Sequence, residues 1–356
     1  MRTNKTKLGQ KRTSVEAGAI VKFGLDVHGE QITVRRQVEG KLSQPAQALS
    51  WAKAKSWIIE HQKAGCKVYS CYEAGPCGYG LHRELEQAGV TNYVVAPQCW
   101  DRSGRRVKTD QRDAGQLGLR LDQYVRGQKE AFTVVRVPTP AQEQRRSLCR
   151  HRDRLVGERK RCAVRGCGLM LAQGIQVQGD WWQPKDWAEL AQRLPGWLRE
   201  QLSHWQSAAL QFDQQVDALT PKIEAFAKGQ TLIKGYGELT AAVVDAEVLD
   251  WKRFNNRRQV GSFTGLCPSE HTSAKKRRQG SINKHGNPRV RRLLVEAIWR
   301  LLYWQPNYKP LYPIRAARGA RERKRAVVAA ARHLAIDLWR INTGQCTAQS
   351  LGLVTQ

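Results

Sequence analysis

The strongest constraint on the fold is a regular alternation of strand and helix patterns over residues 19–126. Apolar residues occupy every second position of residues 21–27, and a His-Gly-Glu turn separates this strand from a returning strand at residues 31–38. Further elements then alternate, with helices at about 46–62, 78–88 and 109–126 and strands at 66–72 and 92–96. A hairpin followed by alternating helices and strands predicts a mixed α/β sheet with helices on its faces.

The next stretch, residues 139–228, is predicted to be helical because Leu148, Leu155, Cys162 and Leu169 recur every seven residues and a clearer apolar stripe follows in the second half. The stripe advances in steps of three and four residues through Leu202, Trp205, Ala209, Phe212, Val216, Leu219, Ile223 and Phe226. This spacing is typical of a coiled-coil seam, and it fits equally a seam inside the chain's own helical bundle and a dimer contact. Pro221 predicts a kink, or a restart of the helix with Thr220 as its N-cap.

The third stretch, residues 229–345, is predicted to be mainly helical and carries most of the positive charge. Helices are expected at about 238–249 and around the apolar face of residues 290–302. Between residues 252 and 340 there are 22 Lys and Arg against four Asp and Glu, a net charge of +18 out of the chain's +29. A basic surface of this kind points to nucleic acid as the partner.

Several other classes of protein are excluded by composition. No apolar run approaches the ~18 residues of a membrane span, and the basic first residues lack the apolar core of a secretory signal. The nine cysteines form no C-x-x-C pair, so we expect reduced, mostly buried thiols. We therefore expect a cytoplasmic protein, associated with the nucleoid when bound to DNA, with no membrane partner. Seven tryptophans are expected to be core anchors, with base stacking as the alternative: Trp51, Trp57, Trp181, Trp182, Trp197, Trp299 and Trp304. Trp100 is the better candidate for stacking.

Four acidic residues stand where a metal site would need them. Asp26 and Glu73 each end a predicted strand, and ligands bind at the carboxyl ends of strands in open α/β sheets. Asp110 and Asp113 open the last predicted helix of this stretch, three residues apart and therefore on one face. Taken singly, each acid is explained as well by a turn, a strand end or the helix dipole. Taken together, they predict a site for Mg²⁺, with Mn²⁺ as the alternative.

The segments that carry these acids, GLDVH, YEAGPCG and KTDQRDA, resemble the N-terminal domain of the DEDD-type transposases of bacterial insertion sequences, the bridge-RNA-guided serine recombinases. The segments LIKGYGELTAAVV and RRQVGSFTGLCPSEHTSAKKRRQGSINKHGNPRVRRLL resemble the family's C-terminal signature. The resemblance covers the first ~110 residues and roughly residues 232–304. It implies an RNase H-like, Holliday-junction-resolvase-like fold for the N-terminal domain. It also assigns the four catalytic, metal-binding acids to Asp26, Glu73, Asp110 and Asp113.

The resemblance further implies a nucleophilic serine after a Gly-Leu-x-Pro turn, which places it at Ser273. Ala274 follows this serine where the family usually has glycine, and the nearby Ser262, Ser269 and Ser281 are alternative candidates for the nucleophile. A serine that attacks a phosphodiester keeps the bond energy in a covalent linkage, although its hydroxyl needs activation. Metal held by the four acids is expected to lower that barrier.

The expected domains are a basic tail at 1–18, a carboxylate domain at 19–130, a coiled-coil or dimerisation segment at 139–228 and a transposase domain with the serine at 229–345. The family's partners are the DNA of element ends and target, a structured guide RNA, and a second copy of the chain, as a dimer with a tetramer as the alternative. Phosphate contacts are expected at Gly235, Gly237, Lys275, Lys276, Arg277, Arg278, Lys284, Arg289, Arg291 and Arg292.

Two other functions fit part of the sequence. The four acids alone fit a junction-resolving nuclease in which metal-activated water is the nucleophile. The positive charge alone fits a non-enzymatic nucleic-acid-binding protein whose carboxylates are structural. Only the C-terminal signature and its serine favour a recombinase.

Overall fold

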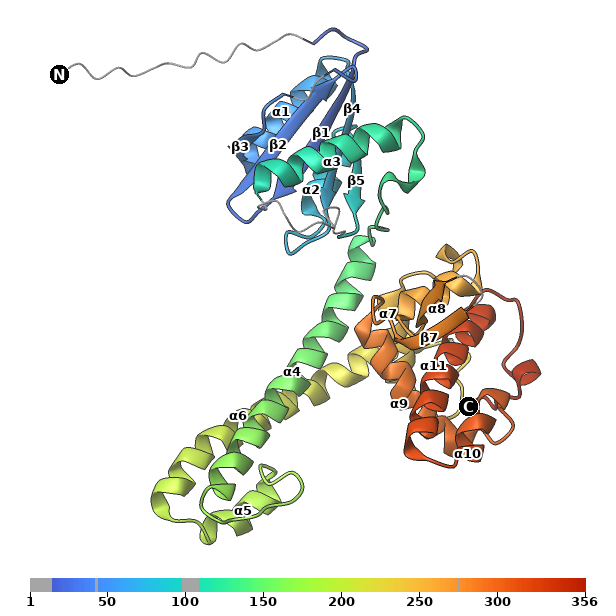
Figure 1. Ribbon diagram of the computed structural model, residues 1–356. Helices are drawn as coiled ribbons and strands as arrows, with labels where there is room; N and C mark the ends of the chain where they lie inside the picture. The colour runs from blue at the N-terminus through green and yellow to red at the C-terminus, as the bar shows by residue number, and fades with distance from the viewer. Residues whose placement is uncertain (1–14, 42–43, 98–108, 274–275) are drawn as a thin grey trace, which may run out of the picture. The chain divides into compact units, whose positions relative to one another are not determined.

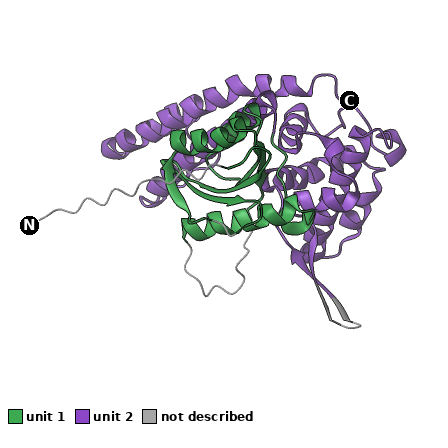
Figure 2. Ribbon diagram, turned by 90° about the horizontal axis from the view of Figure 1, so that it is seen from above, with its two compact units in different colours: residues 1–137 green, residues 138–356 purple. Residues whose placement is uncertain are grey.

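The computed structural model describes residues 15–41, 44–97, 109–273 and 276–356, with backbone only for 271–273 and 276–277. The chain forms two compact units, residues 1–137 and 138–356 (Figure 2). In the described part of the chain, no helix is both long enough and apolar enough to cross a bilayer.

Unit 1 is built on a five-stranded mixed sheet with the order β3-β2-β1-β4-β5 (Figure 1). Its strands are β1 (Ile20–Val27), β2 (Gln31–Val38), β3 (Gln47–Ser50), β4 (Lys67–Glu73) and β5 (Thr91–Val95). Strand β2 is antiparallel to β1 and β3, whereas β4 and β5 run parallel to β1. The predicted mixed α/β sheet is confirmed.

Helices cover both faces of this sheet. Apolar side chains of β1, Val21, Phe23 and Leu25, are fully buried in one core with α1 (Trp51–Lys63) and α2 (Gly80–Gln87). The opposite face carries α3 (Asp110–Val125), which lies across β1 and β2 (Figure 1). Residues 46–50 were expected to begin a helix, but β3 occupies residues 47–50 and Ser50 caps α1 by accepting a hydrogen bond from the Lys53 backbone.

Unit 2 begins with a long helical hairpin. Helix α4 (Pro140–Leu171) and helix α6 (Gly196–Glu224) run in opposite directions side by side, with α5 (Pro184–Gln192) at their far end (Figure 1). Leu202 and Ala209 of the predicted stripe are fully buried in one core with Cys162 and Met170 of α4. The stripe therefore packs against a helix of the same chain, and dimerisation through it stays a prediction.

Of the two alternatives predicted at Pro221, the restart of the helix is wrong, because α6 continues through Pro221 to Glu224. The Thr220 hydroxyl caps no helix: it donates to the Val216 carbonyl at 2.7 Å and accepts from Arg152 Nε at 2.7 Å. The neighbouring helix α4 thus supplies a hydrogen bond at the point where proline interrupts the backbone ladder.

The rest of unit 2 packs around a single large apolar core. Its longer helices are α7 (Glu238–Val248), α8 (Arg257–Thr264), α9 (Pro288–Trp304) and α11 (Ala320–Asn342), with the short α10 (Tyr312–Ala316). Two strands, β6 (Pro268–Ser273) and β7 (Lys276–Ile282), form an antiparallel hairpin that the sequence did not predict. Figure 2 shows this hairpin projecting from the unit.

Candidate metal and recombination site

The carboxylate site of unit 1 begins with a matched pair of repeats on β1 and α3. Alternate residues of β1, namely Lys22, Gly24 and Asp26, face α3. Every fourth residue of α3 faces β1, in the series Asp110, Ala114, Gly118 and Asp122. A step of two residues along the strand covers ~6.6 Å, and a step of four residues along the helix covers ~6 Å. Successive residues of the strand series therefore lie opposite successive residues of the helix series.

One end of this contact is a buried ion pair and its middle is a glycine. Lys22 Nζ lies 2.5 Å from Asp122 Oδ1, and both side chains are almost inaccessible to solvent. A Cβ atom at Gly24 would lie 2.3 Å from the Ala114 carbonyl oxygen and 2.4 Å from the Gly118 nitrogen. Only glycine therefore allows α3 to lie this close to β1. This close approach sets the distance between the first turn of α3 and the end of β1.

The other end of the contact brings Asp26 and Asp110 together through His28. His28 Nε2 lies 3.1 Å from Asp26 Oδ2 and 3.6 Å from Asp110 Oδ1. One ligand atom from each of these three residues lies within 4.8 Å of the others. Sequence reasoning placed His28 in a turn and missed it, although it follows Asp26 by two residues, just past the end of β1, where the alternation of side chains still points it to the same side.

The electrostatics of Asp26 reflect this environment. Burial raises the pKa of the Asp26 carboxyl above its ordinary value, the hydrogen bond and charge of His28 act in the opposite direction, and the nearby charges of Asp113 and Asp110 raise it further. Three carboxylates thus act on one another here. A bound cation would relieve both the burial penalty and the repulsion.

The other two predicted acids lie next to this cluster. Asp113 follows Asp110 by one helical turn, behind an N-cap supplied by the Thr109 side chain. Glu73 is the last residue of β4. Leu25 pairs with Tyr72 in the parallel register of β1 and β4, so the next residues of the two strands, Asp26 and Glu73, are neighbours. Neither Asp113 nor Glu73 belongs to the tight group of ligand atoms. All four predicted acids therefore belong to one end of the unit 1 sheet, and His28 lies beside both Asp26 and Asp110.

The donor set fits a divalent cation. Carboxylate oxygens suit Mg²⁺ and Mn²⁺, and the imidazole of His28 adds a ligand that Mn²⁺ accepts more readily than Mg²⁺. Asp110 is half exposed, which leaves one side of the cluster open to solvent and to a substrate.

The predicted nucleophile, Ser273, belongs to the other unit. It is the last residue of β6 and pairs with Lys276 across the hairpin. Ala274 and the predicted phosphate contact Lys275 lie outside the described residues, and for Lys276 and Arg277 only the backbone is described. Arg278 follows on β7 and is exposed.

The base of the hairpin is fixed by a tight crossing of two loops. Gly265 adopts a left-handed conformation after α8, and a Cβ atom at Gly286 would lie 2.2 Å from the Gly265 nitrogen. Arg291 holds this crossing by donating to the carbonyl oxygens of Thr264 at 3.1 Å and Lys284 at 3.4 Å. The signature block therefore positions the strand that ends at Ser273.

The remaining predicted phosphate contacts are divided between packing and surface. Arg289 and Arg292 both approach Asp153 of α4, at 3.4 and 2.6 Å. The Cα of Gly235 is covered by Trp304, because a Cβ there would lie 2.9 Å from the indole ring. Gly237 is the N-cap residue of α7 with open space around it. Lys284 and Arg292 are exposed.

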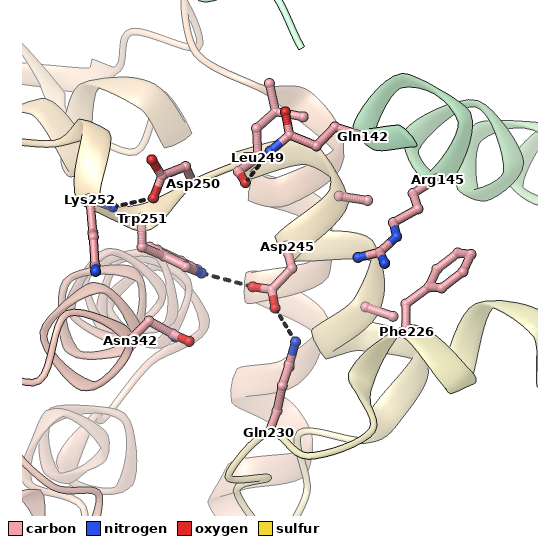
Figure 3. A pocket seen from close by; sticks show the side chains of 12 residues that line it. Gln142, Arg145, Phe226, Gln230, Asp245, Leu249, Asp250, Trp251, Lys252 and Asn342 are labelled. Carbon is pink, nitrogen blue, oxygen red and sulfur yellow. Dashed lines mark hydrogen bonds between the residues drawn. The ribbon is translucent and has the colours of Figure 1, made fainter. Parts of the chain in front are cut away.

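A cavity of about 300 Å³ in unit 2 contains a different carboxylate, Asp245 (Figure 3). Its two oxygens accept hydrogen bonds from Trp251 Nε1 at 2.8 Å and from Gln230 Nε2 at 2.5 Å. Burial raises the pKa of Asp245, and these two hydrogen bonds counter the effect. The carboxylate thereby ties α7 to the segments on either side of it. None of the residues predicted from the sequence as functional lines this cavity.

Known proteins with similar sequences identify the family of the chain. Residues 231–313 match the family described as "Transposase IS116/IS110/IS902 family". The chain is 30% identical over 307 residues to the transposase-named protein y4rJ of Sinorhizobium fredii, covering 76% of each chain. It is 28% identical over 302 residues to the transposase for insertion sequence element IS1111A of Coxiella burnetii, covering 80% of this chain and 79% of the relative. It is 26% identical over 298 residues to the transposase for insertion sequence element IS1533 of Leptospira borgpetersenii, covering 79% and 85%.

The chain is therefore an insertion-sequence transposase and belongs to the IS116/IS110/IS902 family.

Proposed function

We propose that this transposase cuts and rejoins DNA by phosphoryl transfer, with Ser273 as the nucleophile and with a divalent cation held by Asp26 and Asp110. The observation that supports the proposal most directly is the convergence of Asp26, His28 and Asp110 within 4.8 Å at the end of β1. Asp113 and Glu73 complete the proposed set of acids. The sheet order with β2 antiparallel also supports the proposal that unit 1 is RNase H-like.

In the proposed reaction the Ser273 oxygen attacks a DNA phosphorus and loses its proton. A phosphoserine ester forms as the bond to one strand oxygen breaks, and that oxygen leaves as a hydroxyl after gaining a proton. The reverse attack by a strand hydroxyl rejoins DNA and restores the serine. A metal bound at the carboxylates would supply Lewis-acid stabilisation of the phosphoryl charge.

The residues of the chain have distinct tasks in this scheme. Gly24 and the Lys22–Asp122 pair hold α3 against β1 and so keep Asp110 beside Asp26. His28 orients both carboxylates through its Nε2 atom. The basic residues of unit 2 neutralise DNA phosphates, as expected for a stretch with a net charge of +18 between residues 252 and 340.

We further propose that a structured RNA chooses the DNA sequence. A protein whose contacts are mainly cationic reads the backbone and shape of nucleic acid, and base pairing then supplies sequence choice. RNA that copurifies with the protein from cells carrying the element should then contain segments complementary to both donor and target DNA. Copurification of random RNA would contradict this part of the proposal.

The metal site is tested by Mn²⁺ binding, measured by electron paramagnetic resonance, together with recombination in cells. Asp26→Asn and Asp110→Asn should each weaken Mn²⁺ binding by roughly tenfold or more and abolish recombination. The matched control is Asp186→Asn, because Asp186 is also an exposed first-turn acid, at the start of α5. Wild-type Mn²⁺ affinity and recombination in both site variants would refute the metal site.

A further inference from the structure

Three aromatic side chains near the end of α9 are exposed. Trp299, Tyr303 and Trp304 have 46%, 78% and 41% of their surface accessible. Their prediction as core residues was wrong for both tryptophans. Groups of exposed large apolar side chains mark interaction sites on proteins. Together these three residues form an aromatic platform.

The aromatic platform is held in a defined arrangement. The rings of Tyr303 and Trp304 meet edge to face with centroids 4.7 Å apart. Trp299 lies one turn before Tyr303 on the same face of α9. Trp304 also packs on the Cα of Gly235, where a side chain would collide with the indole. The absence of a side chain at Gly235 therefore makes room for the Trp304 ring.

A buried glutamine fixes the segment beside the platform. Gln305 has no accessible surface, and its Nε2 donates to the carbonyl oxygens of Lys234 at 2.7 Å and Val354 at 2.9 Å. Its Oε1 accepts from the Val354 backbone at 2.8 Å. The backbone of Lys234 is therefore immobilised next to the exposed rings.

Cations lie directly over the rings. Lys234 Nζ is 4.5 Å from the centre of the Trp304 ring, and the Arg323 guanidinium is 5.4 Å from the centre of the Trp299 ring. Helix α9 itself carries four arginines and one glutamate. If two copies of the chain made contact through this surface, the positive charges of both copies would be brought together. A polyanion with exposed flat groups matches both the rings and the charge.

We propose that the aromatic platform binds unpaired bases of a single-stranded nucleic acid by stacking, while Lys234 and Arg323 contact the adjacent phosphates. Stacking on aromatic side chains tolerates any base, because every base has a π-face, but it requires that the base be unpaired. Single-stranded RNA and single-stranded DNA share this chemistry. The inference concerns binding alone and does not rest on the recombination chemistry proposed above.

The test measures fluorescence anisotropy of the full-length protein with labelled probes of about 20 nucleotides. The probes are single-stranded RNA, single-stranded DNA of the same sequence, the corresponding DNA duplex, and a single strand with abasic sites. The variants are Tyr303→Ala and Trp299→Ala, with Tyr303→Phe to restore the ring. Trp197→Ala is the matched control, because Trp197 is 51% exposed but lies on α6.

Each platform variant should bind the favoured single strand about 5- to 100-fold more weakly than wild type. Its affinity for the duplex and for the abasic strand should change by less than about twofold, since neither offers a base to stack. Tyr303→Phe and Trp197→Ala should bind as wild type does. The arm with the larger loss, RNA or DNA, identifies the natural ligand.

Three results would overturn the inference. Unchanged affinity for both single strands would remove the platform as a binding surface. An equal loss of affinity for the duplex and the abasic strand would mean that the platform acts only through its positive charge and does not stack on bases. A lower molar mass by light scattering, with unchanged affinity for single strands, would assign the surface to contact between copies of the chain.

Discussion

Replacing Gly24 by alanine is expected to disable the carboxylate site without touching any carboxylate. The new Cβ would lie 2.3 Å from the Ala114 carbonyl oxygen, about 1.1 Å short of the 3.4 Å at which ordinary contact begins. The colliding atoms belong to the backbone of α3, so no side chain can rotate away. The helix must therefore shift by about 1 Å, and Asp110 shifts with it.

The size of the effect follows from that displacement. Overpacking of this kind costs roughly 1–3 kcal/mol of folding free energy. A misplacement of about 1 Å in a catalytic group lowers the rate by roughly 10²-fold. The assays are urea denaturation of the purified protein and excision of the element in cells, with protein levels measured by immunoblotting.

Gly118 provides the matched control, because it faces Gly24 across the same contact. A Cβ at Gly118 would meet the Gly24 nitrogen at 3.8 Å and Cα at 3.9 Å, which is ordinary contact. Gly118→Ala should therefore retain activity and gain up to about 1 kcal/mol from its helical position. Equal behaviour of the two variants, in either direction, would refute the reasoning.

Three further predictions concern charge. Asp122→Ala leaves the buried Lys22 ammonium without its partner and should cost about 3–5 kcal/mol of unfolding free energy in urea; a loss below 1 kcal/mol would mean that the pair is solvated. The folded-state pKa of Asp26 lies above its ordinary value of 3.8, so ionised Asp26 weakens the fold as the pH rises through the interval between the two values. Asp26→Asn should accordingly raise the melting temperature at pH 7 and have little effect well below pH 3.8; equal effects at both pH values would contradict the cause given for the shift. Affinity for nucleic acid should fall steeply between ~50 and 200 mM salt, and a flat response would argue against phosphate contacts.

The fold of unit 1 could be predicted from the sequence because its strands alternate clearly. The inward-facing residues Val21, Phe23 and Leu25 are all fully buried, as their spacing requires. Strand β3 escaped prediction because its four residues, QALS, carry no such alternation. It owes its place to pairing with β2, a tertiary contact.

The β6–β7 hairpin could not be predicted for a related reason. Its strands, PSEHTS and KRRQGSI, are polar and basic and show no buried face in sequence. The hairpin depends on the close contact between Gly265 and Gly286 and on the hydrogen bond from Arg291 to Thr264. These are contacts between residues that lie far apart in the sequence. Sequence spacing alone does not contain that information.

The candidate site was predictable in part. The pairing of Asp26 with Asp110 follows from strand ends and helix starts, which are local features. The participation of His28 required knowing that its side chain faces α3, which the period-two rule from Asp26 would have indicated. The exposure of Trp299 was beyond prediction, because an aromatic stripe on a helix has the same spacing whether it faces a core or solvent.

The central claim, a serine recombinase with a carboxylate metal site, is tested most directly by trapping the covalent intermediate. Cells carrying the element's flanking DNA would express wild type, Ser273→Ala or the control Ser269→Ala, which alters the same strand, β6. After denaturation the protein would be probed for attached DNA. Protein–DNA adducts in wild type and Ser269→Ala, and none in Ser273→Ala, are the predicted result. Adducts that persist in Ser273→Ala, or DNA cleavage without any adduct, would contradict the serine mechanism, and the latter would instead indicate a nuclease that uses water.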